Sequence, residues 1–228
     1  MEIEGTEPYI VGGHTGSGYW VDTNRVTTLE GLFAAGDVAG GSPQKFVTGC
    51  FAEGEIAALS ALKYIKGKEP VAVEHAQMIA KLEEVQQFLK DEATLYSIEE
   101  IEEAMQKVMD VYAGGISSDY VVNSSKLTIA KQRIKGLLDM SKSLKAKDLH
   151  ELKLIYEVLD RLYVCQTVIA HLQARKETRW HCFQENADYP QRDDLHYFNY
   201  VNSFYRHGDV EISFRDIVKK DETYEHQN

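Results

Sequence analysis

Apolar residues recur every three or four positions through the middle of the chain, which is the spacing of amphipathic helices. This pattern predicts four helices, at residues 73–89, 97–113, 124–143 and 148–175. The last is the longest, and the residues of its inward face are Leu152, Ile155, Leu159, Leu162, Gln166, Ile169 and Leu172. Because such helices bury their apolar faces against each other, residues 71–175 are expected to form an antiparallel bundle of three or four helices.

Two of these helices carry recognisable start signals. Ser97 precedes Glu100 by the spacing of a capping box, in which each side chain accepts a hydrogen bond from the other residue's amide. Asp148 and Glu151 are expected to cap the first turn of the last helix. The glycine pair at 114–115 is expected to end the second helix, since glycine accepts the left-handed conformation that follows many helices.

The N-terminal part has a different pattern. Leu32–Ala35 is a short apolar run, which predicts a brief strand covered on both faces. Gly36 and Asp37 follow it, and in open α/β sheets the ligand lies beyond the carboxyl ends of the strands. An aspartate there, beside a glycine that lets the backbone approach a ligand, suits a ribityl or ribose hydroxyl. The alternative is an ordinary strand, glycine turn and core helix.

The sequence on either side of this acid adds two further elements. A loop of small residues at 38–43 leads to a helix that starts near Thr48. Its first amides and the positive end of its dipole suit an anionic flavin oxygen or a phosphate. Upstream, residues 18–28 predict a hairpin with its polar turn at Asn24.

Composition and charge argue against several classes of function. The net charge of −11 disfavours binding to nucleic acid or anionic lipid, because both require a cationic protein surface. The longest apolar runs fall far short of the roughly 18 residues of a membrane span, and the acidic residues 1–5 are unlike a secretory signal. A cytoplasmic location is expected. Three widely spaced cysteines, Cys50, Cys165 and Cys182, argue against a disulfide framework and against a metal or iron–sulfur site within this chain.

Two segments carry a resemblance to a known family. Thr28–Asp37 resembles the second flavin motif of flavoproteins with two dinucleotide-binding domains. From Gly36 to Ala57 the chain resembles the flavoprotein subunit of adenylylsulfate reductase, within the fumarate reductase and succinate dehydrogenase superfamily. A second match, to the C-terminal segment of these subunits, lies at 174–180, 187–190 and 193–194.

The resemblance implies FAD as the cofactor. The residues that it implies as cofactor contacts are Gly36, Asp37, Gly40, Gly41, Lys45, Thr48 and Gly49. It also implies that His14, which lies in a glycine-rich loop, stabilises charge on the substrate beside the flavin. The alternative for His14 is a histidine in a surface turn.

Lys45 is the second catalytic candidate. It stands in the region where fumarate reductases carry an arginine that grips a dicarboxylate. A lysine lacks the planar bidentate fork of arginine, so it weakens the case for a dicarboxylate and suits a point contact to sulfate, phosphate or flavin. The alternative is an exposed loop cation.

The resemblance also implies the fold class, which is α+β. Residues 1–66 would be the C-terminal piece of a two-dinucleotide-binding-domain FAD fold, 71–175 an antiparallel helical bundle, and 176–228 an irregular, aromatic-rich tail that wraps over another surface. The glycine-rich turn that binds the FAD pyrophosphate in such proteins is missing, since the glycines at 12–18 lack its spacing. The chain is therefore expected to be a fragment, a split gene product or a trimmed sequence, and inactive alone.

The implied activity is reduction of adenosine 5'-phosphosulfate, a small-molecule substrate, to sulfite and AMP. The implied partners are the remainder of the flavoprotein subunit and a separate iron–sulfur subunit that delivers electrons. One alternative is a fumarate reductase or succinate dehydrogenase type flavoprotein. Another is a non-catalytic helical interaction module.

Several other polar residues are given structural roles. Glu53 and Glu55 lie near a helix start, where acids are favoured by the dipole, and they are expected to cap it. The charge cluster at 175–179 is expected to fix a domain interface. Cys50 is expected to be a small buried thiol, and His171 a packed histidine.

Overall fold

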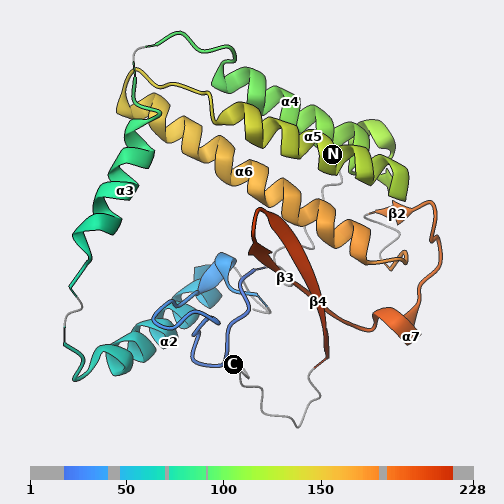
Figure 1. The fold of residues 1–228 in the computed structure, drawn as a ribbon. Helices are drawn as coiled ribbons and strands as arrows, with labels where there is room; N and C mark the ends of the chain where they lie inside the picture. The colour runs from blue at the N-terminus through green and yellow to red at the C-terminus, as the bar shows by residue number, and fades with distance from the viewer. Residues whose placement is uncertain (1–17, 41–46, 70–71, 91, 180–183, 218–228) are drawn as a thin grey trace, which may run out of the picture. The chain divides into compact units, whose positions relative to one another are not determined.

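The computed structural model describes residues 18–40, 47–69, 72–90, 92–179 and 184–217. These residues divide into two compact units. The first contains the described residues up to 69, and the second contains those from 72 to 217 (Figure 1). No helix in the described parts of the chain combines the length and apolar character needed to cross a bilayer.

The first unit is a small set of turns beside one long helix, α2 (Val47–Ile65). Its hairpin is confirmed, since Val21 pairs with Thr27 in an antiparallel bridge. Asp22 closes the turn, because its Oδ1 accepts hydrogen bonds from the amides of Asn24 at 2.8 Å and Val26 at 2.9 Å. The left-handed residue of this turn is Arg25, with φ of 65°.

The strand expected at Leu32–Ala35 is reduced to a single bridge between Phe33 and Val26, so that expectation was wrong. A tight turn precedes it, in which the Thr27 amide donates to the Leu32 carbonyl at 3.0 Å. A 3-10 turn, η1 (Gly36–Val38), follows directly. The run is too short between these turns to form a regular strand, and Leu32 stays exposed while Ala34 is buried.

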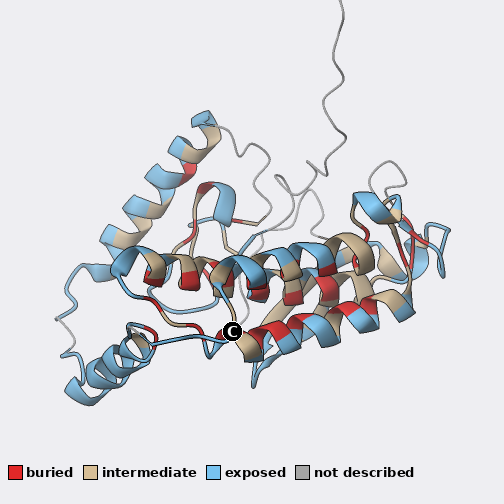
Figure 2. Cartoon of the chain, turned by 90° about the horizontal axis from the view of Figure 1, so that it is seen from above, coloured by how far each residue is buried: buried red, intermediate tan, exposed pale blue. Residues whose placement is uncertain are grey.

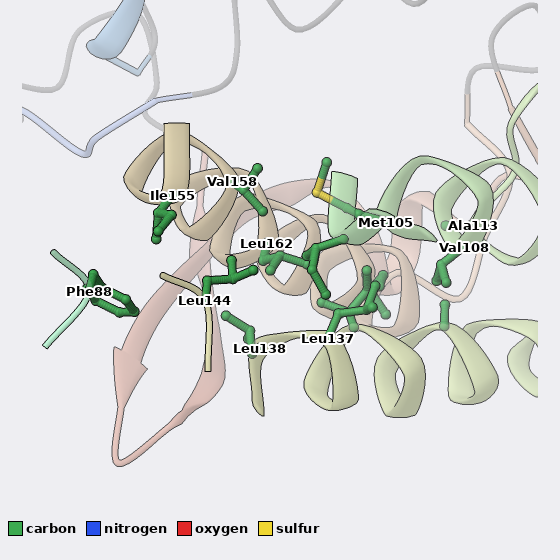
Figure 3. Packing of buried hydrophobic residues seen from close by; sticks show 14 of the residues in the cluster. Phe88, Met105, Val108, Ala113, Leu137, Leu138, Leu144, Ile155, Val158 and Leu162 are labelled. Carbon is green, nitrogen blue, oxygen red and sulfur yellow. The ribbon is translucent and has the colours of Figure 1, made fainter. Parts of the chain in front are cut away.

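The second unit is built on three long helices, α4 (Ile98–Tyr112), α5 (Ser124–Ser141) and α6 (Leu149–Ala174). Each packs against the other two and runs antiparallel to its neighbour in sequence (Figure 1). Figure 2 shows the buried positions as bands along these helices, and Figure 3 shows that the side chains from them meet in one cluster. Its fully buried members include Ile101, Leu127, Ile134, Leu144, Ile155, Leu162 and Ile169.

The expected caps of these helices are confirmed. Ser97 and Glu100 form the capping box, with Ser97 Oγ accepting from the Glu100 amide at 3.1 Å and Glu100 Oε2 accepting from the Ser97 amide at 2.8 Å. Asp148 accepts from the Glu151 amide at 2.9 Å. Gly114 follows α4 with φ of 81°, which is the left-handed conformation expected after a helix.

One predicted helix contacts this cluster only near its end, through the partly buried Val85. The helix α3 (His75–Gln86) forms within the expected range but has no buried residue. Helix spacing within residues 73–89 predicts Ile79 and Leu82 on the inward face, but these side chains are 45% and 55% exposed. Phe88, which follows the helix, is buried instead and packs edge-on against Tyr156 with ring centroids 5.9 Å apart. The fully buried contribution of this segment therefore comes from Phe88, after α3, and the helix itself adds the partly buried Val85.

The segment after α6 is more regular than expected. The strand β2 (Glu185–Asn186) pairs in parallel with β1 (Val121–Val122), which precedes α5. A single helical turn, α7 (Asp194–Tyr197), then leads to an antiparallel hairpin of β3 (Asn199–Arg206) and β4 (Asp209–Asp216). The hairpin packs on α6 (Figure 1), so the prediction of an irregular tail was wrong for residues 199–216.

The missed signal is the dipeptide between these strands. His207 and Gly208 have φ of 51° and 84°. A two-residue loop with positive φ at both positions has the twist that suits an antiparallel hairpin. Gly208 is a residue that predicts such a turn, but histidine is uncommon at the first position of the turn.

Candidate functional site

The candidate cofactor turn is η1, which places Asp37 beside the helix α2. The residue before the turn, Ala35, is extended, and Gly36 then takes φ of 70°. The turn closes by one hydrogen bond, from the Ala39 amide to the Gly36 carbonyl at 3.0 Å. It packs against α2 within the first unit. The sequence therefore brings the predicted acid and the predicted helix together.

Glu53 supports this turn from α2. Its residue exposure is only 6%, and its Oε2 accepts a hydrogen bond from the Gly36 amide at 2.9 Å. Arg25 Nε lies 3.8 Å from the same oxygen. Glu53 lies beyond the first turn of α2, so the expectation that it caps this helix was wrong. Glu55, two residues further on, is exposed.

Gly36 is required by packing against α2. A Cβ built on it would lie 3.1 Å from Cys50 Sγ and 3.4 Å from Cys50 Cβ. Its positive φ also disfavours any other residue. The absence of a side chain at Gly36 therefore allows the turn to pack against the half-buried thiol of Cys50. From the sequence alone, this glycine was expected to let the backbone approach a ligand.

Gly40 lies where the chain leaves the turn and pairs with the segment at Tyr19. The Gly40 amide donates to the Tyr19 carbonyl at 2.8 Å, and the Tyr19 amide donates to the Val38 carbonyl at 2.7 Å. A Cβ on Gly18 would lie 2.6 Å from the Ala39 carbonyl carbon, so these backbones pass in close contact. The Gly40 amide already donates to Tyr19, so it is not free to bind a cofactor. Gly40 could then contribute to a cofactor site only by letting the backbone come close to the ligand.

The surface beside the turn offers three kinds of group. Asp37 presents an exposed carboxylate. Thr48 and Gly49 lie in the first turn of α2, where backbone amides have no acceptor within the helix and carry partial positive charge. Val47 and Phe51, in the first two turns, are 72% and 77% exposed. An acceptor for hydroxyls, donors for an anion and apolar side chains for a ring system fit the chemistry of a flavin.

Three candidate site residues from the sequence lie outside the described residues. They are His14, Gly41 and Lys45. Their roles as substrate-facing or cofactor-contacting residues stay predictions. Within the described parts of the chain, no group of three or more His, Cys, Asp or Glu side chains is arranged to hold a metal ion.

A second cluster of charged residues lies at the end of α6, in the second unit. Glu177 has a fully buried side chain and forms ion pairs with Arg175 and Arg179. Its Oε2 also accepts from the Asp193 amide at 2.9 Å. Arg175 reaches further, donating to the carbonyls of Tyr197 at 2.9 Å and Asn199 at 3.1 Å. The cluster therefore fixes the path of the chain from α6 to β3.

Electrostatics in this cluster favour the charged carboxylate. Burial alone would raise the pKa of Glu177, but hydrogen bonds from Arg179, the Asp193 amide and Arg175 outweigh it and hold the pKa below its ordinary value. The neighbouring Thr178 is also buried, and its hydroxyl donates to the Tyr189 carbonyl at 2.9 Å and accepts from the Asn186 amide at 2.9 Å. These contacts indicate that the segment at 174–179, which resembles the family, has a structural role: it holds the chain after α6 in place.

Two other titratable groups lie along α6. Burial lowers the pKa of His171, with Arg175 adding to the effect, and His171 Nε2 lies 3.0 Å from Ser203 Oγ on β3. The expectation of a packed histidine is confirmed. Burial raises the pKa of the Cys165 thiol, which makes it a poorer nucleophile at neutral pH.

Comparisons with protein families and with curated proteins both match this chain to flavoproteins. The family described as fumarate reductase flavoprotein C-term matches residues 99–227. Adenylylsulfate reductase subunit alpha from Megalodesulfovibrio gigas is 28% identical over 239 residues, which cover 90% of this chain and 36% of that protein.

Several solved structures are similar to the chain, and two of them are reductases of this type. Adenylylsulfate reductase from the hyperthermophilic Archaeoglobus fulgidus has a TM-score of 0.77 at 31% identity, over 87% of this chain and 33% of that one. An adenosine-5-phosphosulfate reductase in complex with sulfite, as a covalent adduct, has a TM-score of 0.76 at 31% identity with the same coverage. The chain thus spans about a third of the length of the relatives that it matches.

Proposed function

The chain belongs to the fumarate reductase flavoprotein C-terminal family, and from this premise we propose that it is part of an FAD-dependent oxidoreductase subunit of the adenylylsulfate reductase type. The observation that carries the proposal is the turn at Gly36–Val38, which presents Asp37 beside the start of α2. The similarity to two adenylylsulfate reductases at 28% and 31% identity supports the same class.

The proposed reaction is the two-electron reduction of adenosine 5'-phosphosulfate. The bond between sulfur and the bridging phosphate oxygen breaks, AMP leaves with that oxygen, and the sulfur leaves as sulfite. When bound and reduced, FAD would supply the two electrons, and a separate iron–sulfur subunit would then reduce the flavin again. The substrate is proposed from the names of the relatives, and the iron–sulfur partner is proposed from the family resemblance.

The chain's own residues would act by binding and electrostatics. Asp37 would accept hydrogen bonds from ribityl or ribose hydroxyls, and the amides of Thr48 and Gly49 would face negative charge. His14 would stabilise charge on the sulfate group, and Lys45 would make a point contact to sulfate, phosphate or flavin. These assignments rest on the resemblance and on the residues' chemistry.

The exposed side of α2 supports a further partner, the remainder of the flavoprotein subunit. Beyond Val47 and Phe51, the helix exposes Leu59, Leu62 and Ile65 by 60%, 61% and 58%. Large apolar side chains gathered on one element mark an interface. We therefore propose that α2 packs against the nucleotide-binding half that the longer relatives contain, and that residues 1–66 contribute to the FAD domain.

A fumarate reductase or succinate dehydrogenase type activity is the second candidate. It is favoured by the family match over residues 99–227. Lys45 speaks against it, because a dicarboxylate is held best by the bidentate fork of arginine.

The test is reconstitution with the nucleotide-binding half, either in one polypeptide or as a second chain, followed by addition of FAD. The proposal predicts a yellow protein that, with reduced electron donor, converts adenosine 5'-phosphosulfate to sulfite and AMP and leaves fumarate unchanged. Turnover of fumarate alone would favour the second candidate. A protein that stays colourless would contradict both and favour a non-catalytic interaction module.

A further inference from the structure

Glu53 lies beneath the proposed flavin contact rather than at it. Its carboxylate accepts the Gly36 amide at 2.9 Å across seventeen positions of sequence. Gly36 is bonded directly to Asp37, so the direction of the Asp37 side chain depends on the backbone angles of Gly36. This hydrogen bond ties the first residue of the turn to a side chain of α2.

The turn needs such support. It is a three-residue 3-10 turn closed by one internal hydrogen bond, and 3-10 turns have poorer hydrogen-bond geometry than α-helices. Glycine at its first position has the widest conformational freedom of any residue. Without an external acceptor the Gly36 amide would be buried and unpaired, which favours other conformations of the turn.

A carboxylate is a strong acceptor for this amide. Hydrogen bonds to ionised acceptors are roughly twice as strong as neutral ones. The ion pair with Arg25 is long at 3.8 Å, and Arg25 Nε has no hydrogen-bond partner among the described residues. The amide of Gly36 is therefore the closest partner that the structure gives Glu53.

We propose that Glu53 is a positioning residue, whose buried carboxylate holds the Gly36 amide and thereby fixes the turn that presents Asp37 to the flavin. This inference rests on the proposed function. It predicts that Glu53 and Asp37 act as one unit in flavin binding, although Glu53 itself does not touch the flavin.

A double-mutant cycle on the reconstituted protein tests the coupling, with FAD affinity measured by quenching of flavin fluorescence. Asp37→Ala is expected to weaken FAD binding about tenfold in the wild-type background. Glu53→Ala is expected to weaken it to a similar extent, and adding Asp37→Ala to that variant should change the affinity by less than about threefold. Glu53→Gln, which keeps a neutral and therefore weaker acceptor in place, should fall between wild type and Glu53→Ala.

Two further variants separate positioning from a loss of fold. Glu53→Asp shortens the side chain by one methylene and withdraws the carboxylate from Gly36, so it should reproduce the cycle if Glu53→Ala does not fold. Glu55→Gln removes an exposed carboxylate from the same helix and should leave the affinity unchanged. Without FAD, amide hydrogen exchange of the peptide that contains Gly36–Val38 should rise about tenfold in the Ala and Asp variants only.

The possible failures are distinguishable. If wild-type protein binds no FAD, the proposed function fails and the role of Glu53 fails with it. If wild type binds FAD but the effects of Glu53 and Asp37 substitutions simply multiply, or Glu53→Ala and Glu53→Asp bind FAD as wild type does, the positioning role alone is overturned.

Discussion

Arg179 and Glu177 form a bidentate ion pair just beyond the end of α6. Arg179 Nε donates to Glu177 Oε1 at 2.8 Å, and Nη2 donates to Oε2 at 2.9 Å. This parallel arrangement matches the planar fork of arginine to the two carboxylate oxygens. The Glu177 side chain is 0% exposed and that of Arg179 is 12% exposed. Because solvent does not replace either partner, the pair is sensitive to loss of one member.

We expect Glu177→Ala to destabilise the second unit by about 3 kcal/mol, because it leaves Arg175 and Arg179 without their shared carboxylate. The measurement is urea unfolding followed by circular dichroism. Asp194→Asn is the matched control, since Asp194 is 52% exposed and also accepts from Arg179. That change should cost less than about 1 kcal/mol, as exposed ion pairs do. Equal losses for the two variants would contradict the importance of burial here.

The same carboxylate gives a pH dependence whose sign follows from its lowered pKa. Burial opposes the charged form, but the hydrogen bonds from Arg179, Asp193 and Arg175 keep the folded pKa of Glu177 below 4.5. The stabilisation is therefore complete above the unfolded pKa near 4.5 and is lost as pH falls through the folded pKa. Urea midpoints from pH 7 to pH 3 should fall less steeply for Glu177→Gln than for wild type. Parallel curves would show that Glu177 does not contribute to acid sensitivity.

Much of the second unit followed from local chemistry visible in the sequence. The capping box at Ser97 and Glu100 formed as predicted, because both residues satisfy backbone amides within one turn. The inward positions of α6, such as Ile155 and Leu162, are fully buried, since helical periodicity alone decides which side chains share a face. Local signals of this kind are independent of the rest of the fold.

Other features depended on tertiary context that periodicity does not contain. The helix α3 was predicted correctly, but burial of its apolar face was not. Ile79 and Leu82 remain exposed because no described element covers them. In the candidate site, Asp37 and the start of α2 could be placed from sequence. The buried bond from Glu53 to Gly36 could not, because it joins residues seventeen positions apart through an unpredicted 3-10 turn.

Glycine at 114 combines a backbone requirement with a packing requirement. Its φ is 81°, and a Cβ there would lie 2.7 Å from Val122 Cγ1 and 2.3 Å from Gln184 Nε2. Gly208 has a similar φ of 84° but nothing within 4 Å of the added Cβ. We expect Gly208→Ala to cost about 1 kcal/mol from the left-handed conformation, and Gly114→Ala about 3 kcal/mol because overpacking adds to it. Thermal unfolding of both variants measures the difference, and similar melting temperatures would contradict it.

Asp37 provides the most direct test of the candidate site, because it is the exposed acid of the turn. In the protein reconstituted with its nucleotide-binding half, Asp37→Ala should lower FAD affinity about tenfold, the loss of a hydrogen bond to a charged acceptor. Asp37→Asn should lose less, because the amide oxygen still accepts. Glu30→Ala is the control, since Glu30 is an exposed acid of the same unit that pairs with Lys68 at 3.0 Å, outside the turn. Flavin fluorescence titration gives the affinities and circular dichroism the melting temperatures. If Asp37→Ala and Glu30→Ala bind FAD equally well while both remain folded, Asp37 is not a flavin contact, and the turn has only a structural role.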